Sequence, residues 1–208
     1  MKSQQTSLDT ISNNLANINT TGYKKERTEF QSLLYQTIQE KTTDHEGNPK
    51  PIGAQVGLGV KVSAVSTEFE QGELTASTGD FDFAIQGNGF FMIEMPDGTT
   101  GYTRNGNFLM AINPNGGTTL TTADGYSVLD SNGKAISFDA ATDTTRLSFD
   151  NYGNIFYKNA QGVIQPTGVR IGAAQFNNPS GLTKLGDSYF AESAASGNAR
   201  IEGQDAAL

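Results

Sequence analysis

The 208-residue chain contains no cysteine and a single histidine, His45. Without cysteine it cannot form disulfides, thiolate zinc sites or thiol nucleophiles. One imidazole in a polar segment argues against both a zinc site and a Ser–His–Asp triad. We therefore expect no metal and no other cofactor.

The chain also lacks long apolar runs and an excess of positive charge. No run approaches the roughly 20 residues of a membrane span, and residues 1–5 lack the hydrophobic core of a Sec signal. With 14 basic and 22 acidic side chains the formal net charge is −8, whereas an electrostatic nucleic-acid binder needs a basic face. We expect neither membrane insertion nor a nucleic-acid partner.

The composition instead indicates a β-rich chain. The hydrophobic fraction is 36% and the mean hydropathy is −0.42, and both values are low for an enzyme of this length. The 24 glycines, together with abundant Asn, Thr and Ser, are typical of many turns between short strands. From residue 60 onward, turn signals recur about every 8 to 12 residues, which is the pattern of an all-β domain.

The strongest local pattern is an amphipathic helix from about Ser3 to Ile18. Its apolar residues recur at the spacing of a coiled-coil seam, and they are Leu8, Ile11, Leu15 and Ile18. So narrow an apolar stripe does not hold a helix of this length in water, so the helix needs another helix to pack against. Because the remainder indicates β structure, we expect that partner outside this chain or on another copy.

Two segments separate this helix from the β-domain. A polar turn follows the helix, and we expect Gly22 to end it in the left-handed conformation. The apolar residues of 30–38 fit one helical face, which predicts a short helix, with a docked extended arm as the alternative. The polar, proline-containing stretch of 40–59 predicts a linker or a surface loop without regular structure.

The predicted fold class is mainly β: an irregular β-rich outer domain with an N-terminal coiled-coil-type helix and an extended arm. Within that domain we expect 81–85 and 89–95 to pair as a hairpin around Gly87. The chain divides into four parts, which are the helix and arm at 1–39, the linker at 40–59, the β-domain at 60–194 and a flexible tail at 195–208.

A search for catalytic groups finds none. Asp130–Gly133 and Asp150–Asn154 resemble calcium loops but lack the full ligand set, so Asx-Gly hairpin turns explain them better. Asp80 and Asp82 are spaced as a glycosidase pair on one strand face would be, yet the solvated side of an alternating strand explains them more simply. We expect a protein that is not an enzyme.

Residues 12–24, Ser-Asn-Asn-Leu-Ala-Asn-Ile-Asn-Thr-Thr-Gly-Tyr-Lys, resemble the N-terminal signature of the rod, hook and hook-associated axial proteins of the bacterial flagellum. Further segments are similar to those of distal-rod members in particular: 30–37, 53–60, 70–74, 82–91, 96–98, 102–106, 176–182 and 194–197. The resemblance covers nearly the whole chain in the expected order.

The resemblance implies a structural subunit of the flagellar distal rod, the drive shaft, which self-assembles into a helical tube that transmits torque from motor to hook. The implied partners are further copies, neighbouring rod and hook proteins, the surrounding bushing rings and the flagellar type III export apparatus. The implied location is the basal body, from the periplasm to the level of the outer membrane, reached without a Sec signal. Members of the family carry a C-terminal helix that pairs with the N-terminal one, so we expect this chain to be truncated at both polymerising ends.

The same resemblance assigns roles to three sets of residues. The polymerisation helix comprises Leu8, Ile11, Asn14, Leu15, Asn17 and Ile18. The elbow that follows it comprises Thr20, Thr21, Gly22, Tyr23 and Lys24. The inter-subunit stretch, which corresponds to the part specific to the distal rod, comprises Ile38, His45, Pro49, Pro51, Val56 and Leu58.

Two alternatives stay open at this point. Within the family, a hook or proximal-rod protein would differ chiefly in residues 39–60. From a different class, a secreted β-domain that binds a carbohydrate or another surface ligand would need an exposed aromatic cluster, for which the candidates are Tyr102, Tyr126, Tyr152 and Tyr157.

Overall fold

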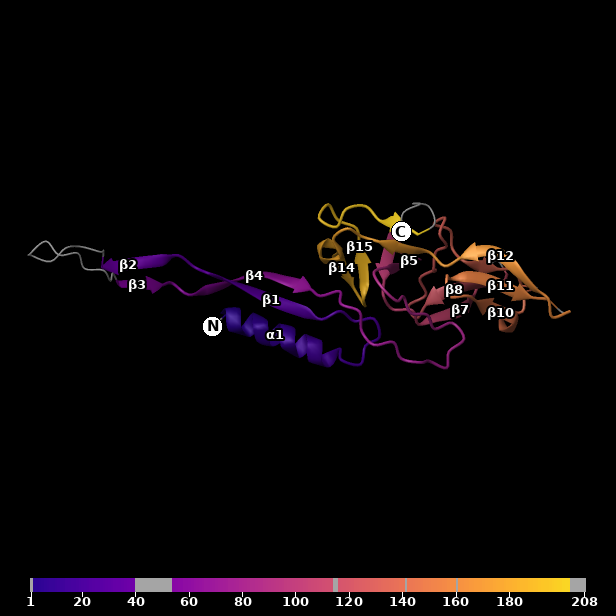
Figure 1. The fold of residues 1–208 in the computed structure, drawn as a ribbon, viewed down its shortest axis with the longest axis horizontal. Helices are drawn as coiled ribbons and strands as arrows, with labels where there is room; N and C mark the ends of the chain where they lie inside the picture. Colours follow the sequence, from indigo (N-terminus) through magenta and orange to yellow (C-terminus); the bar gives the residue numbers. More distant parts are fainter. Residues whose placement is uncertain (1, 40–53, 114–115, 141, 160, 203–208) are drawn as a thin grey trace, which may run out of the picture. The chain divides into compact units, whose positions relative to one another are not determined.

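The structure, a computed structural model, describes residues 2–39, 54–113, 116–140, 142–159 and 161–202. It is mainly β with an N-terminal helix, as predicted (Figure 1). The chain forms two compact units. Unit 1 comprises residues 1–18 and 25–68, and unit 2 comprises residues 19–24 and 69–208.

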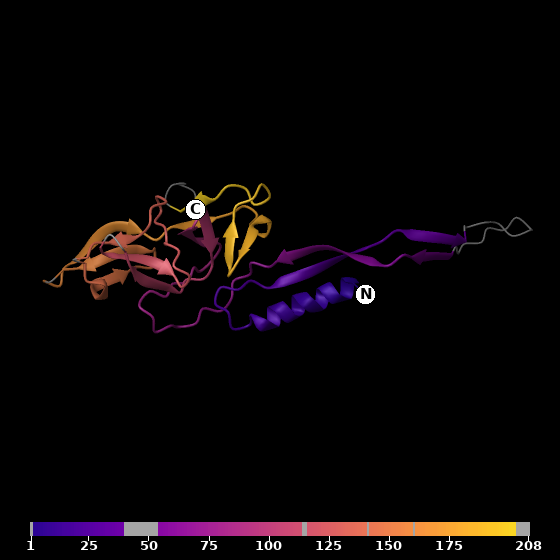
Figure 2. The ribbon, with the colours of Figure 1, turned by 180° about the vertical axis from the view of Figure 1, so that it is seen from behind.

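Unit 1 combines one helix with a two-stranded antiparallel ribbon. Helix α1 spans Lys2–Ala16, close to the predicted range. Strand β1 (Glu26–Ser32) pairs with β4 (Val60–Thr67), and β2 (Tyr35–Gln39) pairs with β3 (Ala54–Gly57). The helix lies alongside β1 and β4 in both views of the ribbon (Figures 1 and 2).

The ribbon corrects the short helix predicted at 30–38. These residues are mostly extended in β1 and β2, because antiparallel partners at 54–57 and 60–67 satisfy their backbone groups, whereas an isolated helix of that length is marginal. Residues 54–57 are accordingly a strand and not part of a loop. Strand β4 belongs to unit 1 and not to the outer β-domain, so unit 1 extends to Glu68. Leu58 and Gly59 continue the backbone pairing of the ribbon with Leu34 and Leu33, and the remaining part of the predicted linker, 40–53, lies outside the described residues.

A six-stranded sheet forms one half of unit 2, with the strand order β14-β15-β6-β5-β13-β16. Its strands are β5 (Phe90–Glu94), β6 (Thr100–Thr103), β13 (Ala173–Gln175), β14 (Thr183–Gly186), β15 (Tyr189–Ala191) and β16 (Arg200–Ile201). The first core cluster lies mainly on this sheet and consists of Phe90, Met92, Tyr102, Leu129, Ala174, Phe176, Leu182 and Phe190. Its phenylalanine rings meet edge to face, an arrangement that aromatic pairs favour.

Two three-stranded sheets form the other half of unit 2. One consists of β7 (Phe108–Ile112), β8 (Thr118–Thr122) and β9 (Ser137–Phe138), and the other of β10 (Leu147–Phe149), β11 (Asn154–Lys158) and β12 (Ile164–Arg170). Short 3₁₀ turns at Thr144–Arg146 and Pro179–Gly181 interrupt the loops. The second core cluster comprises Phe91, Phe108, Leu120, Val128, Ile136, Ile155 and Ile171.

One turn geometry recurs along unit 2. In each instance a glycine with φ between 75 and 88° donates its N–H to the carbonyl three residues earlier, and the glycines are Gly98, Gly116, Gly125, Gly133, Gly153 and Gly162. This is a three-residue hairpin loop closed by a glycine bulge. The Asp130 and Asp150 carboxylates accept backbone N–H bonds within their own turns. The predicted Asx-Gly turns are therefore confirmed.

Two predictions within unit 2 are wrong. Residues 81–85 form no hairpin with β5, because Phe81 and Phe83 bond instead to the backbone of Phe108 and Gly106. A Cβ atom on Gly106 would stand only 1.8 Å from the Phe83 carbonyl oxygen, so this close approach requires glycine. The expected flexible tail is also ordered as far as it is described, since Ser196 is 1% exposed and β16 joins the large sheet. Its last six residues, 203–208, lie outside the described part.

Candidate assembly surface

Helix α1 turns its polar side toward the ribbon and its apolar side away from it. Thr10 is the buried residue of the helix, at 8% exposure. The predicted seam residues Leu8, Ile11, Leu15 and Ile18 are 63%, 59%, 68% and 72% exposed. A surface helix normally buries its apolar stripe. Here the polar face is against the ribbon and the apolar face is exposed.

Asn14 forms the most specific contact between the helix and the ribbon. Its Nδ2 donates to the Glu26 carbonyl oxygen at 2.8 Å, and its Oδ1 accepts from the Glu26 N–H at 2.9 Å. The side-chain amide therefore pairs with both backbone groups of the first residue of β1, as a neighbouring strand would. The other predicted helix residue with an amide, Asn17, bonds back to Asn13 within the helix end.

Two further polar contacts fix the rotation of the helix about its axis. The Thr28 hydroxyl donates to the Thr10 hydroxyl at 2.9 Å, and Thr10 donates to the Thr6 carbonyl oxygen at 2.9 Å. Near the start of the helix, the Ser3 hydroxyl donates to the Val60 carbonyl oxygen at 3.0 Å. Contacts at the beginning, middle and end of one helix face hold that face on the ribbon, and the seam consequently points outward.

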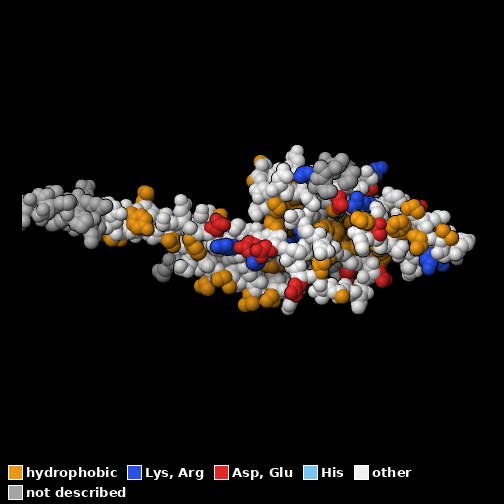
Figure 3. All heavy atoms as spheres, in the orientation of Figure 1, with side chains coloured by type: hydrophobic (Ala, Val, Ile, Leu, Met, Phe, Trp, Pro, Cys, Tyr) orange, Lys and Arg blue, Asp and Glu red, His pale blue; other side chains and the backbone are white. Residues whose placement is uncertain are grey.

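The ribbon carries an exposed apolar surface of its own. Its large exposed apolar side chains are Phe30, Leu33, Leu34, Tyr35, Ile38, Val56, Leu58, Val60 and Val65. The space-filling view shows hydrophobic side chains as separate orange groups on the visible face of this part of the chain (Figure 3). A two-stranded ribbon is at best marginally stable in water without packing on its faces. Three residues of the predicted inter-subunit stretch, Ile38, Val56 and Leu58, lie here, whereas His45, Pro49 and Pro51 lie outside the described residues.

The elbow residues belong to unit 2. Gly22 has φ of +74°, as predicted, and a Cβ atom there would stand 2.7 Å from the Asn105 amide nitrogen. The Tyr23 N–H closes the turn on the Thr20 carbonyl oxygen, while Thr20 and Thr21 are exposed. Lys24 reaches the Glu70 carbonyl oxygen at 2.7 Å. The elbow is therefore a tightly packed turn of unit 2.

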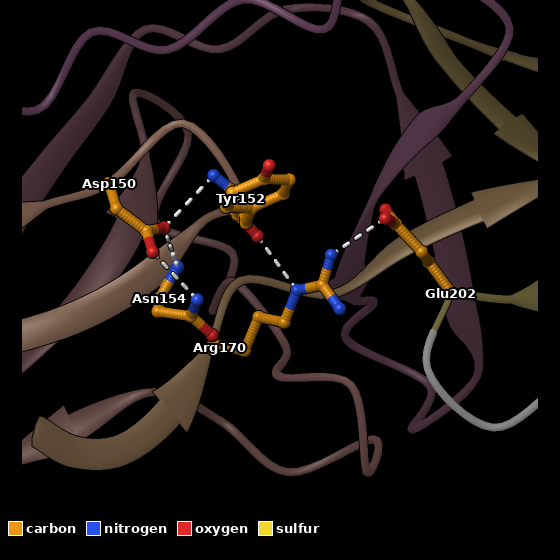
Figure 4. A network of polar contacts seen from close by, with 5 residues as sticks. All are labelled: Asp150, Tyr152, Asn154, Arg170 and Glu202. Carbon is orange, nitrogen blue, oxygen red and sulfur yellow. Dashed lines mark hydrogen bonds and ion pairs between the residues drawn. The ribbon is translucent and has the colours of Figure 1, made fainter.

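A polar network that the sequence did not point to holds the last described strand of unit 2 (Figure 4). The Arg170 Nη2 donates to Glu202 at 2.6 Å, and its Nε donates to the Tyr152 carbonyl oxygen at 2.7 Å. Asp150 accepts from Tyr152 and Asn154 in the adjoining turn, and the side-chain bond from Asn154 is the main reason that the pKa of Asp150 is lowered. An arginine and a glutamate 32 residues apart give no local pattern that would have predicted this pair.

The aromatic cluster required by the ligand-binding alternative does not form. Tyr102 is only 3% exposed and donates to Glu192 at 2.6 Å, and its burial raises its pKa. Tyr152 is 74% exposed, while Tyr126 and Tyr157 are half-buried. In the described parts of the chain no group of three His, Cys, Asp or Glu side chains could hold a metal ion. Nor is any helix there long and apolar enough to cross a membrane.

Comparison with known proteins adds a second line of observation. The family model of the flagellar hook protein FlgE/F/G D1 domain matches residues 84–157, and that of the flagella basal body rod protein matches residues 1–24. The chain is 42% identical over 204 residues to the flagellar basal-body rod protein FlgG of Caulobacter vibrioides, covering 97% of this chain and 74% of that protein. It is 40% identical to FlgG of Bacillus subtilis, covering 98% of this chain and 74% of that protein.

A hook protein matches less of the chain. The flagellar hook protein FlgE of Helicobacter mustelae is 41% identical over 133 residues, which is 62% of this chain and 28% of that protein. The two rod-protein matches extend over nearly all of the chain, including the ribbon that the hook alternative would change.

Proposed function

The chain belongs to the FlgG family of flagellar basal-body rod proteins, and from that premise we propose that it is a distal-rod subunit that self-assembles with further copies into a helical tube. The family is structural, and its members are components of the rod in the flagellar basal body. We infer that the subunit lies in the distal rod and that the tube transmits torque from motor to hook.

One observation carries the proposal: the apolar seam of α1 is presented to the outside by polar contacts on the opposite helix face. Leu8, Ile11 and Leu15 are each more than half exposed, although the helix already has a neighbour in the ribbon. Burying a side chain of this size stabilises a contact by about 1.5–3 kcal/mol. A second helix that packs along the seam would therefore gain a coiled-coil interface without rearranging α1.

The exposed ribbon supports a second contact in the same assembly. Ile38, Val56 and Leu58 lie on β2, on β3 and just after it, and are exposed. We assign them to contacts between neighbouring subunits, with the helices forming the inner layer of the tube. In this arrangement the helices form a tight inner interface and the ribbons form a broader apolar interface between neighbours. Torque would pass through both interfaces.

The relatives are named as flagellar basal-body rod proteins, which supports a place in the basal body. We infer that the subunit meets neighbouring rod and hook proteins, the bushing rings around the rod and the flagellar type III export apparatus. Its place is the basal body, where we infer a location from the periplasm to the level of the outer membrane.

Serine substitution in the seam tests this function. The double variant Ile11→Ser/Leu15→Ser, introduced into the chromosomal gene, is expected to abolish swimming and to leave basal bodies without a complete rod in electron micrographs. The matched control is Leu185→Ser, which changes an exposed leucine on β14 in unit 2. Normal rods and swimming in the double variant, with normal protein levels, would contradict the proposal.

A further inference from the structure

Lys24 and Arg104 converge on one short segment of unit 2. The Lys24 Nζ donates to the Glu70 carbonyl oxygen at 2.7 Å, and the Arg104 Nη1 donates to the Gln71 Oε1 at 3.4 Å. Gly22, two residues before Lys24, packs against the backbone of Arg104 and Asn105. The elbow thus places Lys24 near Arg104, although the two residues are 80 positions apart in the sequence.

Neither of these two cations is paired with a carboxylate within the described residues. Lys24 bonds a backbone carbonyl, and Arg104 bonds a side-chain amide through a long contact. The Arg104 Nε is buried and has no hydrogen-bond partner in the described part of the chain. By contrast, Lys25, Arg146 and Arg170 each form an ion pair with a carboxylate.

The surroundings of the two cations favour an added anion. Both side chains are half-buried, and the Arg104 guanidinium carbon lies 5.2 Å from the centre of the Phe90 ring. Burial, and then the charge of Arg104, lowers the pKa of Lys24, and burial lowers the pKa of Arg104. Two neighbouring positive charges that have lost part of their hydration are stabilised by an opposite charge between them.

A carboxylate fits this pair in shape as well as in charge. The guanidinium group is planar and presents parallel N–H donors, which suit the two oxygens of a carboxylate, while the ammonium adds a third donor. The Phe90 ring lies against the guanidinium and the Nε is buried, so an incoming carboxylate has to reach the terminal nitrogens of the guanidinium. The pair therefore presents three N–H donors to one carboxylate.

We propose that Lys24 and Arg104 form a binding site for a carboxylate side chain of a second copy of this chain. The inference rests on the proposed self-assembly. A second copy supplies carboxylates in excess, because the chain has 22 acidic and 14 basic residues and a net charge of −8. The same net charge repels a polyanion such as nucleic acid. Two acidic copies also repel one another, so a contact that places a carboxylate on this cation pair fixes how neighbouring copies are oriented.

Self-association of the purified chain, measured by sedimentation velocity over a range of concentrations, tests the site. Lys24→Gln and Arg104→Gln are each expected to weaken association about five- to tenfold, and about 1 M salt is expected to weaken the unaltered chain comparably. The matched controls are Lys184→Gln and Arg146→Gln, which remove cations from other parts of unit 2 and are expected to change association less than twofold. Arg104→Lys keeps a positive charge at this position, so it should retain more of the association than Arg104→Gln.

Zero-length cross-linking with a carbodiimide identifies the partner group directly. A mixture of unlabelled and ¹⁵N-labelled chains is expected to give mixed-isotope peptides that join Lys24 to an Asp or Glu. Association that is unchanged in both glutamine variants, or Lys24 cross-links found only within one chain, would overturn the site while leaving self-assembly intact. An unaltered chain that associates neither alone nor on added isolated rods would instead overturn the proposed self-assembly, and the site with it.

Discussion

The two units of this chain follow opposite rules for the placement of apolar side chains. Unit 2 buries Phe90, Phe176 and Phe190 in one cluster and Phe91 and Phe108 in another, and several of these rings meet edge to face. Unit 1 buries Thr10 and pairs Asn14 with backbone, while its leucines and isoleucines are exposed. Unit 2 therefore has a hydrophobic core of its own, whereas unit 1 leaves its large apolar side chains exposed, as the proposed assembly requires.

The two units also differ in what their side-chain hydrogen bonds do. In unit 2 the polar contacts of Tyr102 and Arg170 fasten strands around a core that already exists. In unit 1 the contacts of Ser3, Thr10 and Asn14 take the place of a core between helix and ribbon. Hydrogen bonds fix the orientation of α1 on the ribbon but add little net stability. The helix is therefore specifically oriented but weakly attached.

The largest expected effect is on the core of unit 2. Phe108→Ala should lower the free energy of unfolding by about 3–5 kcal/mol, because Phe108 is 2% exposed and contacts Phe91. Urea unfolding followed by tyrosine fluorescence measures this loss. A loss below 1 kcal/mol would mean that unit 2 is not the self-sufficient part of the chain.

A smaller effect is expected at the contact between α1 and the ribbon. Asn14→Ala should cost about 1–2 kcal/mol in helix docking, because it leaves the Glu26 N–H and carbonyl without their side-chain partner. Hydrogen exchange of residues 2–16 measures the loss as faster exchange there with unchanged exchange in unit 2. Gln5→Ala, at an exposed position of the same helix, is the matched control, and equal exchange in the two variants would contradict the role of Asn14.

A further effect concerns the dependence of stability on pH. A hydrogen bond from the Asn154 side chain is the main cause that lowers the pKa of Asp150 in the folded chain. The unfolded value is about 3.9, so the stability from this group is present above that pH and is lost as pH falls through the lower, folded pKa. Asp150→Asn should therefore reduce the loss of melting temperature between pH 5 and pH 2.5. Lys184→Gln, remote from this turn in the sequence, should leave the slope unchanged.

The smallest effect on stability is expected at the seam of unit 1. Leu15→Ser should change the free energy of unfolding of the isolated chain by less than about 0.5 kcal/mol, because Leu15 is 68% exposed. The same substitution should impair assembly. A large loss of stability in dilute solution would show that the seam already packs within the chain, and the contrast between the units would then fail.

Local patterns predicted the parts of the fold that depend on neighbouring residues. The helix of α1, the left-handed Gly22 and the Asx-Gly turns at Asp130 and Asp150 each follow from residues within a few positions of one another. Leu15 of the predicted seam is 68% exposed in the described part of the chain. These features need no knowledge of the distant parts of the chain.

The features that could not be predicted depend on contacts between residues far apart in the sequence. Residues 30–38 are mostly extended because their partners lie beyond residue 53, and a helical spacing of apolar residues does not reveal such a partner. The polar docking face of α1 was missed for a related reason, since patterns of amphipathicity assign the apolar side to the contact. The pairs Arg170–Glu202 and Lys24–Arg104 likewise depend on the completed fold.

The narrowness of the seam has a consequence for how an assembly begins. One pairing between two copies would bury four side chains from each copy, and since each is already about one-third buried, the gain is about 8–16 kcal/mol. Bringing two copies together costs an estimated 4–15 kcal/mol in lost translational and rotational freedom. Two copies that meet in solution therefore gain little net free energy. A copy that joins the end of an existing structure loses its translational and rotational freedom once but contacts several neighbours. In the proposed assembly, a seam of this width would favour elongation over nucleation and would confine growth to ends that already exist.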